Sequence, residues 1–256
     1  MNYVYETHLH TVEASACGKV PGKDYITYMQ DLGYAGIIVT DHFFNGNSRV
    51  PKDLPWEDRV EQYCSGFAHA YAAAAGTDFT VMFGIEYNFD GDEFLLYGVD
   101  KKWLLSNPHI MDQTRAEVYA TVHEGGGIMI QAHPYRERDY LSAIHLTPDV
   151  CDGAEVYNAA NPDYQNALAF EYAAERDFRM SAGSDIHYFN PKALGGMMFD
   201  HPITSIREFK NAFLNREGIP VCMRDLTAED RHFVPVSEYP ELLKTEEKPT
   251  LPVIWH

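Results

Sequence analysis

Residues 35–42 read Ala-Gly-Ile-Ile-Val-Thr-Asp-His, an apolar run that ends in a carboxylate and an imidazole. Such a run is typical of a strand that is buried on both faces, as in a parallel sheet. Asp41 and His42 would then stand at the carboxyl end of this strand, which is where barrels of parallel strands place their active sites. The stretch predicts an α/β protein with a polar site at one rim of the sheet.

Similar runs occur along the chain and alternate with segments of helical periodicity, which is the pattern of βα units. We expect strands over residues 3–6, 35–40, 79–84, 94–99, 128–132, 153–157 and 178–182. We expect helices over residues 22–32, 56–75, 113–124, 164–175 and 205–215. The 256 residues fit a single α/β barrel domain over residues 1–225, with a tail over 226–256 that packs on or beside the barrel.

The chain carries 38 acidic and 20 basic side chains, for a formal net charge of −18. This balance disfavours binding to long nucleic acid, so an anionic substrate would need a local positive group. A secretory pattern and an apolar stretch of about 20 residues are both missing, so we expect a cytoplasmic protein with no membrane partner. The four cysteines are far apart and are expected to be reduced. The sequence leaves the oligomeric state open.

Five of the twelve histidines stand where an expected strand ends, and carboxylates stand beside them. Two side chains two residues apart in extended backbone point to the same side, so a His-x-His or Asp-x-His pair can direct two ligands at one centre. A mixed set of imidazole and carboxylate ligands suits zinc, manganese or iron better than calcium or magnesium. The residues at these strand ends are His8, His10, Asp41, His42, Glu86, His133, Asp185 and His187.

The order of these residues resembles the PHP (polymerase and histidinol phosphatase) superfamily. The resemblance spans about residues 3–215 and rests on the complete ordered set, because any one motif alone is a weak signal. It implies a distorted (β/α)7 TIM-like barrel, two to three clustered divalent metal ions (zinc, manganese or iron) and hydrolysis of phosphoesters. The motifs are His8-Leu9-His10-Thr11, Val39-Thr40-Asp41-His42, Gly84-Ile85-Glu86, Ala132-His133-Pro134-Tyr135 and Ala182-Gly183-Ser184-Asp185-Ile186-His187.

The resemblance also implies a role for each matching residue. Glu86 would bridge a first metal ion to a second ion, which His133 would also bind. His42 and His187 would hold a third ion. The remaining ligands of the first ion would be His8, His10 and Asp185.

The chain departs from the family at two points. A further histidine between the Glu and the His-Pro motif is missing, and the strand there begins Glu93-Phe94-Leu95, so the second ion would be completed by water, substrate or Glu93. A further ligand of the third ion is expected a few residues after His-x-His. The candidate is Glu13, with Cys17 as the alternative and a solvated loop carboxylate as the non-functional interpretation of Glu13.

Arg136 follows the His-Pro-Tyr motif directly and is the candidate for holding a phosphate oxygen with its planar fork of donors. A surface ion pair with Glu137 or Asp139 is an equally weighted alternative. Asp185, His187 and Arg136 are therefore the candidate catalytic residues, and His187 or His42 would protonate the leaving group if the third ion is absent.

The expected function is metal-dependent hydrolysis of a small phosphomonoester, as in the histidinol phosphatases of the family. A phosphodiesterase or exonuclease that acts on short nucleotides is the second possibility, because both also occur in the family. A non-catalytic metal-binding barrel is the third. The physiological substrate is set by variable loops between strands and helices, such as residues 43–55, and does not follow from the motifs.

Overall fold

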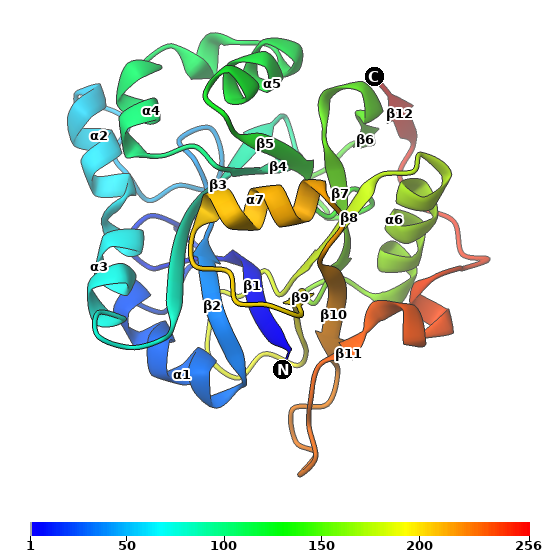
Figure 1. The fold of residues 1–256 in the computed structure, drawn as a ribbon. Coiled ribbons are helices and arrows are strands. Elements are labelled where there is room, and N and C mark those ends of the chain that lie inside the picture. Colours follow the sequence, from blue (N-terminus) through cyan, green and yellow to red (C-terminus); the bar gives the residue numbers. More distant parts are fainter. Residues whose placement is uncertain (1) are drawn as a thin grey trace.

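A ten-stranded sheet, curled into a half-barrel, forms the centre of the protein, for which the computed structural model describes residues 2–256 (Figure 1). In spatial order its strands are β11 (Val234–Pro235), β10 (Ile219–Met223), β9 (Leu194–Phe199), β1 (Tyr3–Leu9), β2 (Tyr34–Val39), β3 (Thr80–Phe89), β4 (Asp92–Tyr97), β5 (Ile128–Gln131), β7 (Gly153–Asn158) and β8 (Arg179–Gly183). The expected mixture of α and β structure is confirmed.

Strand direction is mixed. β1, β2 and β3 run parallel to one another, as do β5, β7 and β8, whereas β4 is antiparallel to both of its neighbours and β9 is antiparallel to β1. Just beyond β8, Ile186 pairs with Leu9 of β1, and the two backbones exchange hydrogen bonds there. This contact brings the carboxyl ends of the first and last parallel strands together at one rim.

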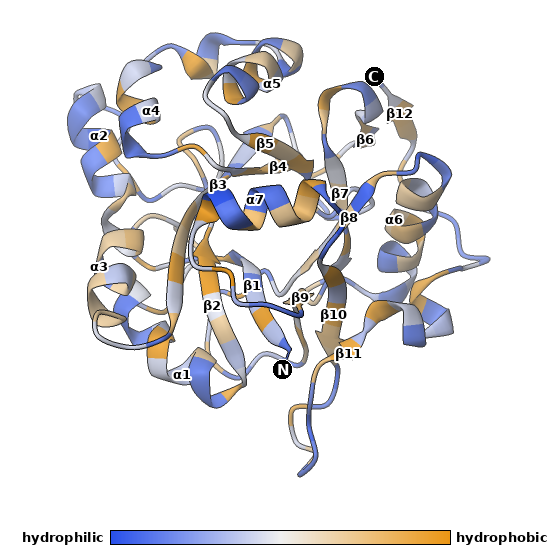
Figure 2. Ribbon diagram, viewed as in Figure 1, coloured by the Kyte–Doolittle hydropathy of each residue, from blue (hydrophilic) through white to orange (hydrophobic). Residues whose placement is uncertain are grey.

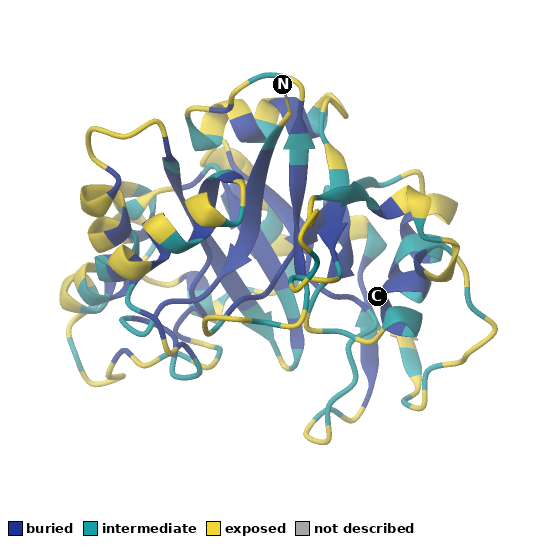
Figure 3. Ribbon diagram, turned by 90° about the horizontal axis from the view of Figure 1, so that it is seen from below, coloured by how far each residue is buried: buried dark blue, intermediate teal, exposed yellow. Residues whose placement is uncertain are grey.

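Helices cover the outside of the curled sheet. In Figure 1, α1, α2 and α3 lie on one side and α6 lies on the opposite side. Hydrophobic residues concentrate on the strands, and the exposed surfaces lie mainly on the helices and loops (Figures 2 and 3). The helices are α1 (Tyr25–Asp31), α2 (Trp56–Tyr63), α3 (Ser65–Ala73), α4 (Lys101–Ser106), α5 (Arg115–Glu124), α6 (Asp163–Glu175) and α7 (Ile206–Leu214).

β2 shows why an uninterrupted apolar run specifies a strand here. Ile37 packs in one apolar cluster with Met29 of α1, while its neighbour Ile38 packs in another cluster with Phe209 of α7. Successive side chains of a strand point to opposite faces, so a strand covered on both faces needs apolar residues at every position. β2 therefore anchors Asp41 and His42, which follow it, to a rigid part of the core.

Each expected strand and helix is present with shifted ends, and the expected helix over residues 56–75 is divided at Cys64 into α2 and α3. Several elements were not expected. They are α4, β9, β10, β11, β6 (Ile144–Leu146) and β12 (Val253–Trp255).

The sequence does not mark β9 as a strand, because paired glycines are more typical of a turn. Gly195 and Gly196 instead sit where the strand passes close to other backbone: an added Cβ would lie 2.4 Å from the Gly183 carbonyl oxygen and 2.6 Å from that of Tyr5. Glycine is therefore required at both positions by close packing in the sheet.

The C-terminal segment lies against the barrel. β12 pairs in parallel with β6, and the Glu137 carboxylate accepts hydrogen bonds from the backbone N–H groups of Thr250 and Leu251 at 2.6 and 2.8 Å. These contacts fix the loop that contains Glu137. Among residues 2–256, no helix is both long and apolar enough to cross a membrane.

Candidate metal centre

Histidine and carboxylate side chains converge at the rim formed by the carboxyl ends of the parallel strands. Five of them are at most 5% exposed and form what we call the inner cluster: His8, His10, Glu86, His133 and Asp185. Four others lie toward a cavity and form the outer group: Cys17, His42, Glu93 and His187. The structure thus brings together seven of the eight side chains that the sequence analysis named as metal ligands.

Glu86 of β3 is the centre of the inner cluster. Its Oε1 lies 3.0 Å from His8 Nε2 and 3.1 Å from His133 Nε2. Asp185 Oδ1 lies 3.1 Å from His10 Nε2 and 3.5 Å from His8 Nε2. His8 therefore faces both carboxylates, which makes it a shared member of two groups of potential metal ligands: His8 with Glu86 and His133, and His8 with His10 and Asp185.

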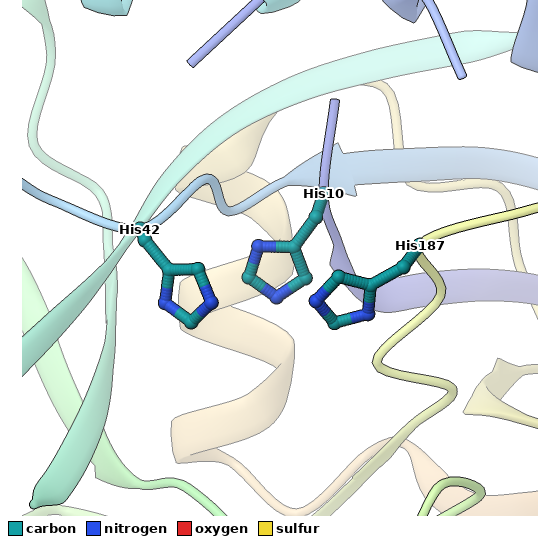
Figure 4. A group of neighbouring side chains, drawn as sticks. All are labelled: His10, His42 and His187. Carbon is teal, nitrogen blue, oxygen red and sulfur yellow. The ribbon is translucent and has the colours of Figure 1, made fainter. Parts of the chain in front are cut away.

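The outer group is continuous with the inner cluster. His42 Nδ1 lies 2.6 Å from Glu86 Oε2 and 3.6 Å from Glu93 Oε1. The rings of His10, His42 and His187 point toward one another (Figure 4), with the His10 ring centroid 4.4 Å from that of His42 and 4.2 Å from that of His187. These three histidines can each offer one nitrogen to a single ion.

Buried polar atoms without hydrogen bonds show that this arrangement fits metal ions. Within residues 2–256, His8 Nε2, His10 Nε2, His42 Nδ1 and one oxygen of Glu86 are buried and lack a partner in hydrogen-bonding geometry, although they face one another at short distances. A buried polar atom without a partner costs free energy, and an ion bound among these atoms removes that cost. The donor set of imidazoles and carboxylates suits zinc, iron or manganese.

Neighbouring side chains fix the orientation of the ligand rings. His8 Nδ1 lies 3.0 Å from Glu155 Oε1, so the other ring nitrogen, Nε2, is turned toward the cluster. Glu155 also accepts a hydrogen bond from the backbone N–H of His133 at 3.0 Å. A carboxylate behind a histidine fixes the tautomer of the ring and strengthens it as a metal ligand. Sequence reasoning missed this role, because the position of Glu155 inside β7 gives no signal of a contact with His8.

Asp41 supports the site from a second side. Its carboxylate accepts hydrogen bonds of 2.6 Å from the backbone N–H of Thr11, the Thr11 hydroxyl and the Ser15 hydroxyl. The same Ser15 oxygen lies 3.1 Å from His10 Nδ1 and accepts a hydrogen bond from the backbone N–H of His42. Asp41 is therefore not a ligand but a clamp that holds the loop after β1 against the end of β2.

Two residues of the inner cluster have a left-handed backbone. His133 has a φ of 29° and Asp185 has a φ of 54°. Non-glycine residues adopt such angles at a cost that the surrounding structure must offset, and functional sites are where these angles concentrate. The strain shows that the turns after β5 and β8 are shaped to direct these two side chains inward.

The carboxylates of the cluster attract cations, and against the effect of burial they raise the pKa of the facing His8 and His42 rings well above the usual range. Burial alone would raise the pKa of the Glu86 carboxyl, but His42, His8 and His10 outweigh this effect and hold its pKa well below the usual range. Burial also raises the pKa of Asp185, and Arg136 and His8 outweigh it and lower the pKa well below normal. Both side chains are therefore carboxylates, the form that binds cations. For His10, burial and the neighbouring His187 and His42 lower the pKa, which favours the neutral ring that a ligand requires.

Arg136 is committed to the cluster itself. Its guanidinium donates hydrogen bonds to Asp185 Oδ2 at 2.6 Å, to Asn158 Oδ1 at 2.8 Å and to Asn161 Oδ1 at 2.9 Å. It forms no ion pair with Glu137 or Asp139, the alternative weighed from the sequence. The ion pair neutralises one oxygen of Asp185 and leaves the other oxygen directed at His10 and His8. Arg136 also lines the cavity.

Glu13 is the one named ligand that the structure keeps apart from the cluster. Its two oxygens accept the backbone N–H of Gly22 at 3.2 and 3.1 Å, and Oε1 lies 2.9 Å from the ring of His69. Cys17 is instead the residue beside the rings of His42 and His187. Burial acts to raise the pKa of the Cys17 thiol, but these two rings outweigh burial and lower it to about 6.

Glu93 stands where the sequence lacks the further histidine. Its Oε2 lies 3.5 Å from His133 Nε2, and Oε1 accepts a hydrogen bond from the side-chain amide of Asn88 at 3.2 Å. Together with His42 and Glu86 it forms a further group of potential ligands. The antiparallel pairing of β3 with β4 places Glu93 opposite Asn88 and turns it toward His133.

A cavity of about 550 Å³ opens over the outer group. His42, Glu93, Asp185 and His187 form its floor, and Arg136 and Arg138 stand in its wall. The remaining wall is polar and neutral, with the side chains of Asn45, Asn47, Asn88 and Tyr140. A small polar molecule can therefore reach the cluster through this cavity.

Solved structures with the same fold identify the architecture. A two-domain protein from Bacteroides vulgatus, described as containing a predicted PHP-like metal-dependent phosphoesterase, matches with a TM-score of 0.65 and 16% identity over 86% of this chain. This chain spans 64% of that protein. An amidohydrolase from Chromobacterium violaceum with bound sulfate and no metal matches with a TM-score of 0.53 and 15% identity, over 88% of this chain and 99% of its own.

The lesion-specific endonuclease EndoQ from Pyrococcus furiosus matches over all of this chain and 75% of its own, with a TM-score of 0.54 and 13% identity. No family model and no curated protein matches the sequence. At these identities the likeness concerns the fold. The chain has the fold of the PHP-like metal-dependent phosphoesterases, as the order of its motifs predicted.

Proposed function

We propose that the protein is a metal-dependent phosphoesterase that hydrolyses a small phosphomonoester. The observation that carries the proposal is the set of buried ring nitrogens and carboxylate oxygens that converge without hydrogen-bond partners at the floor of a cavity. A purely structural role would leave these atoms paired with one another. The names of the structures with the same fold support the same class of reaction.

We propose ligand sets that follow the family resemblance, adjusted to the distances within the cluster. His8, His10, Asp185 and Glu86 would hold one ion, and Glu86, His133 and Glu93 would hold a second. His42 and His187 would hold a third ion, with Cys17 rather than Glu13 as the added ligand. Divalent ions at these positions would supply Lewis acidity toward the phosphoryl oxygens and the attacking water.

The chain's own residues orient this site. Arg136 keeps Asp185 in position, and its remaining N–H groups are available at the cavity wall for a phosphoryl oxygen. His187 Nδ1 lies 2.8 Å from the Asp185 carbonyl oxygen, which leaves Nε2 as the ring nitrogen beside Cys17 and the cavity. We propose Nε2 of His187 as a third-ion ligand or, when the third position is empty, as the proton donor to the leaving oxygen.

A nuclease is the second candidate, because the Pyrococcus furiosus protein with this fold is a lesion-specific endonuclease. The net charge of −18 and the small number of cations at the cavity argue against a long nucleic-acid substrate. A short nucleotide remains compatible with a cavity of about 550 Å³.

We also propose an architecture for the whole chain. The curled sheet is a distorted (β/α)7 barrel in one domain, with residues 226–256 as a segment docked on it.

The experiment that tests the function is a substrate panel. Purified protein with added zinc, manganese or iron is assayed on phenyl phosphate, on bis-p-nitrophenyl phosphate and on a single-stranded oligonucleotide. We expect turnover of the monoester that stops on chelation and returns with metal. Turnover of the diester or the oligonucleotide alone would support the nuclease instead. Metal binding without turnover of any substrate would leave the third interpretation, a non-catalytic metal-binding barrel.

A further inference from the structure

The cavity wall carries a second arginine whose charge is not balanced. Arg138 lines the same cavity as Asp185 and His187, and it is half-buried. The only hydrogen bond recorded for its guanidinium within residues 2–256 goes to the Glu137 carbonyl oxygen, at 2.8 Å. No carboxylate in that range comes within 4.0 Å of it. A half-buried guanidinium without an anion is unusual, because desolvation of the charge is then uncompensated.

The carboxylates near Arg138 in the chain and at the cavity already interact with other groups. Arg136 takes one oxygen of Asp185, and the other oxygen of Asp185 faces His10. Glu137 points away from the cavity, where its carboxylate accepts hydrogen bonds from Thr250, Leu251 and Tyr164. The loop therefore directs its two arginines into the cavity and its carboxylate out of it.

Glu93, the other carboxylate that lines the cavity, already faces His42 and His133. Asn45 and Asn88 are tied to each other, since the Asn45 amide donates to the Asn88 carbonyl oxygen at 2.7 Å. Tyr140, on the same loop as Arg138, is 79% exposed at the cavity mouth. Among residues 2–256, Arg138 is thus the arginine of the cavity wall that lacks an anion, and a ligand held at the cluster by its phosphoryl group would meet it.

We propose that Arg138 binds a second anionic group of the substrate, so that the protein acts on small phosphomonoesters that also carry a carboxylate or a further phosphate. This inference rests on the proposed phosphoesterase function. It assigns the two arginines different tasks: Arg136 holds Asp185 and faces the phosphoryl group, and Arg138 determines specificity. Guanidinium is well suited to this task, because its planar donors match both carboxylate and phosphate.

The test compares three phosphomonoesters that share a phenyl ring and differ at its para position: phenyl phosphate, 4-carboxyphenyl phosphate and 1,4-phenylene bisphosphate. We expect the metal-loaded protein to prefer at least one of the two substrates with a second anionic group over phenyl phosphate by about tenfold or more in kcat/KM, mainly through KM, which is the effect of one charge-assisted hydrogen bond. The larger preference identifies carboxylate or phosphate as the second group.

Arg138→Gln should abolish this preference, and Arg138→Lys should retain part of it, because lysine keeps the charge but not the fork of donors. Arg207→Gln, a change of the same kind on the exposed face of α7 and outside the cavity, should leave the preference as in the unaltered protein. Melting temperatures of all variants check that they fold.

Two failures are distinguishable. If no phosphomonoester is turned over at any metal loading, the proposed function is wrong. If phenyl phosphate is turned over but the substrates with a second anionic group are not preferred, or if Arg138→Gln keeps the preference, the role of Arg138 is wrong and the phosphoesterase stands.

Discussion

The inner cluster and the outer group use the same kinds of side chain but differ in burial and support. His8 and His10 are completely buried, and the second ring nitrogen of each is held by Glu155 or Ser15. His187 and Cys17 are only partly buried and face the cavity. Rigid support favours permanent occupancy, whereas exposure favours exchange. The comparison teaches that one continuous set of potential ligands can contain a rigidly supported end and an exposed end.

The largest effect is expected from a substitution at the centre of the inner cluster. Glu86→Gln keeps the shape of the side chain but removes the charge that four histidines face. We expect loss of both inner ions and a fall of at least about a hundredfold in phosphomonoester turnover, beyond the range typical of supporting residues. Elemental analysis and kinetics measure the two effects, and Glu57→Gln on the exposed side of α2 is the matched control. Full metal content in Glu86→Gln would remove Glu86 from the ligand set.

The next effect weakens the support and leaves the ligands in place. Glu155→Gln removes the carboxylate behind His8 and should lower the affinity of the inner cluster for metal by about 10–100-fold. Competition with a chelator of known affinity measures the change. The outer group does not contact Glu155, so its ion should be released at the same chelator concentration as in the unaltered protein. An equal shift for every ion would show that the two regions are not separable.

A third change sharpens the comparison at the exposed end. Cys17→Ser should remove one equivalent of metal and leave the inner ions bound, because a neutral hydroxyl is a poor substitute for a thiolate ligand. In cobalt-substituted protein the same change should remove the sulfur-to-cobalt absorption in the near ultraviolet. Cobalt-loaded protein without such absorption, together with unchanged metal content in Cys17→Ser, would exclude the thiol as a ligand.

The smallest effect is expected for Glu13→Gln. The amide still accepts a hydrogen bond from Gly22, and only the charge beside His69 is lost, so unfolding free energy should fall by about 1 kcal/mol or less. Urea denaturation measures this change, and metal content should stay the same. Loss of one equivalent of metal in Glu13→Gln would instead restore the ligand role that the sequence first suggested for it.

Much of the fold and of the metal centre could be predicted from the sequence, since apolar runs of four to six residues mark buried strands and the polar residues after them mark the rim. That rule located His42 after β2 and Asp185 after β8. It could not separate Glu13 from Cys17, because both lie in the loop after β1 and only its path, fixed by Asp41 and Ser15, decides which side chain faces His42.

Two further features lay beyond sequence reasoning for physical reasons. Glu155 belongs to β7, and its contact with His8 joins residues 147 positions apart, a pairing that depends on closure of the sheet. β9 carries glycines at the places where backbones approach closely, and this use of glycine looks the same in sequence as a turn. Long-range closure and close packing are properties of the assembled sheet and leave no local pattern.

The attachment of Glu137 to Thr250 and Leu251 has a consequence for the order in which the protein matures. A ribosome completes every residue of the inner cluster and the outer group by His187, long before it reaches residue 250. Domains generally fold as units, N-terminal ones first, and the sheet as far as β10 is complete by Met223, so a nascent chain can gather its metal ligands while the loop with the two arginines is still unfastened. Metal loading and substrate selectivity would then be acquired at separate moments. The metal cluster would form first, and the loop with Arg136 and Arg138 would be fixed in place afterwards.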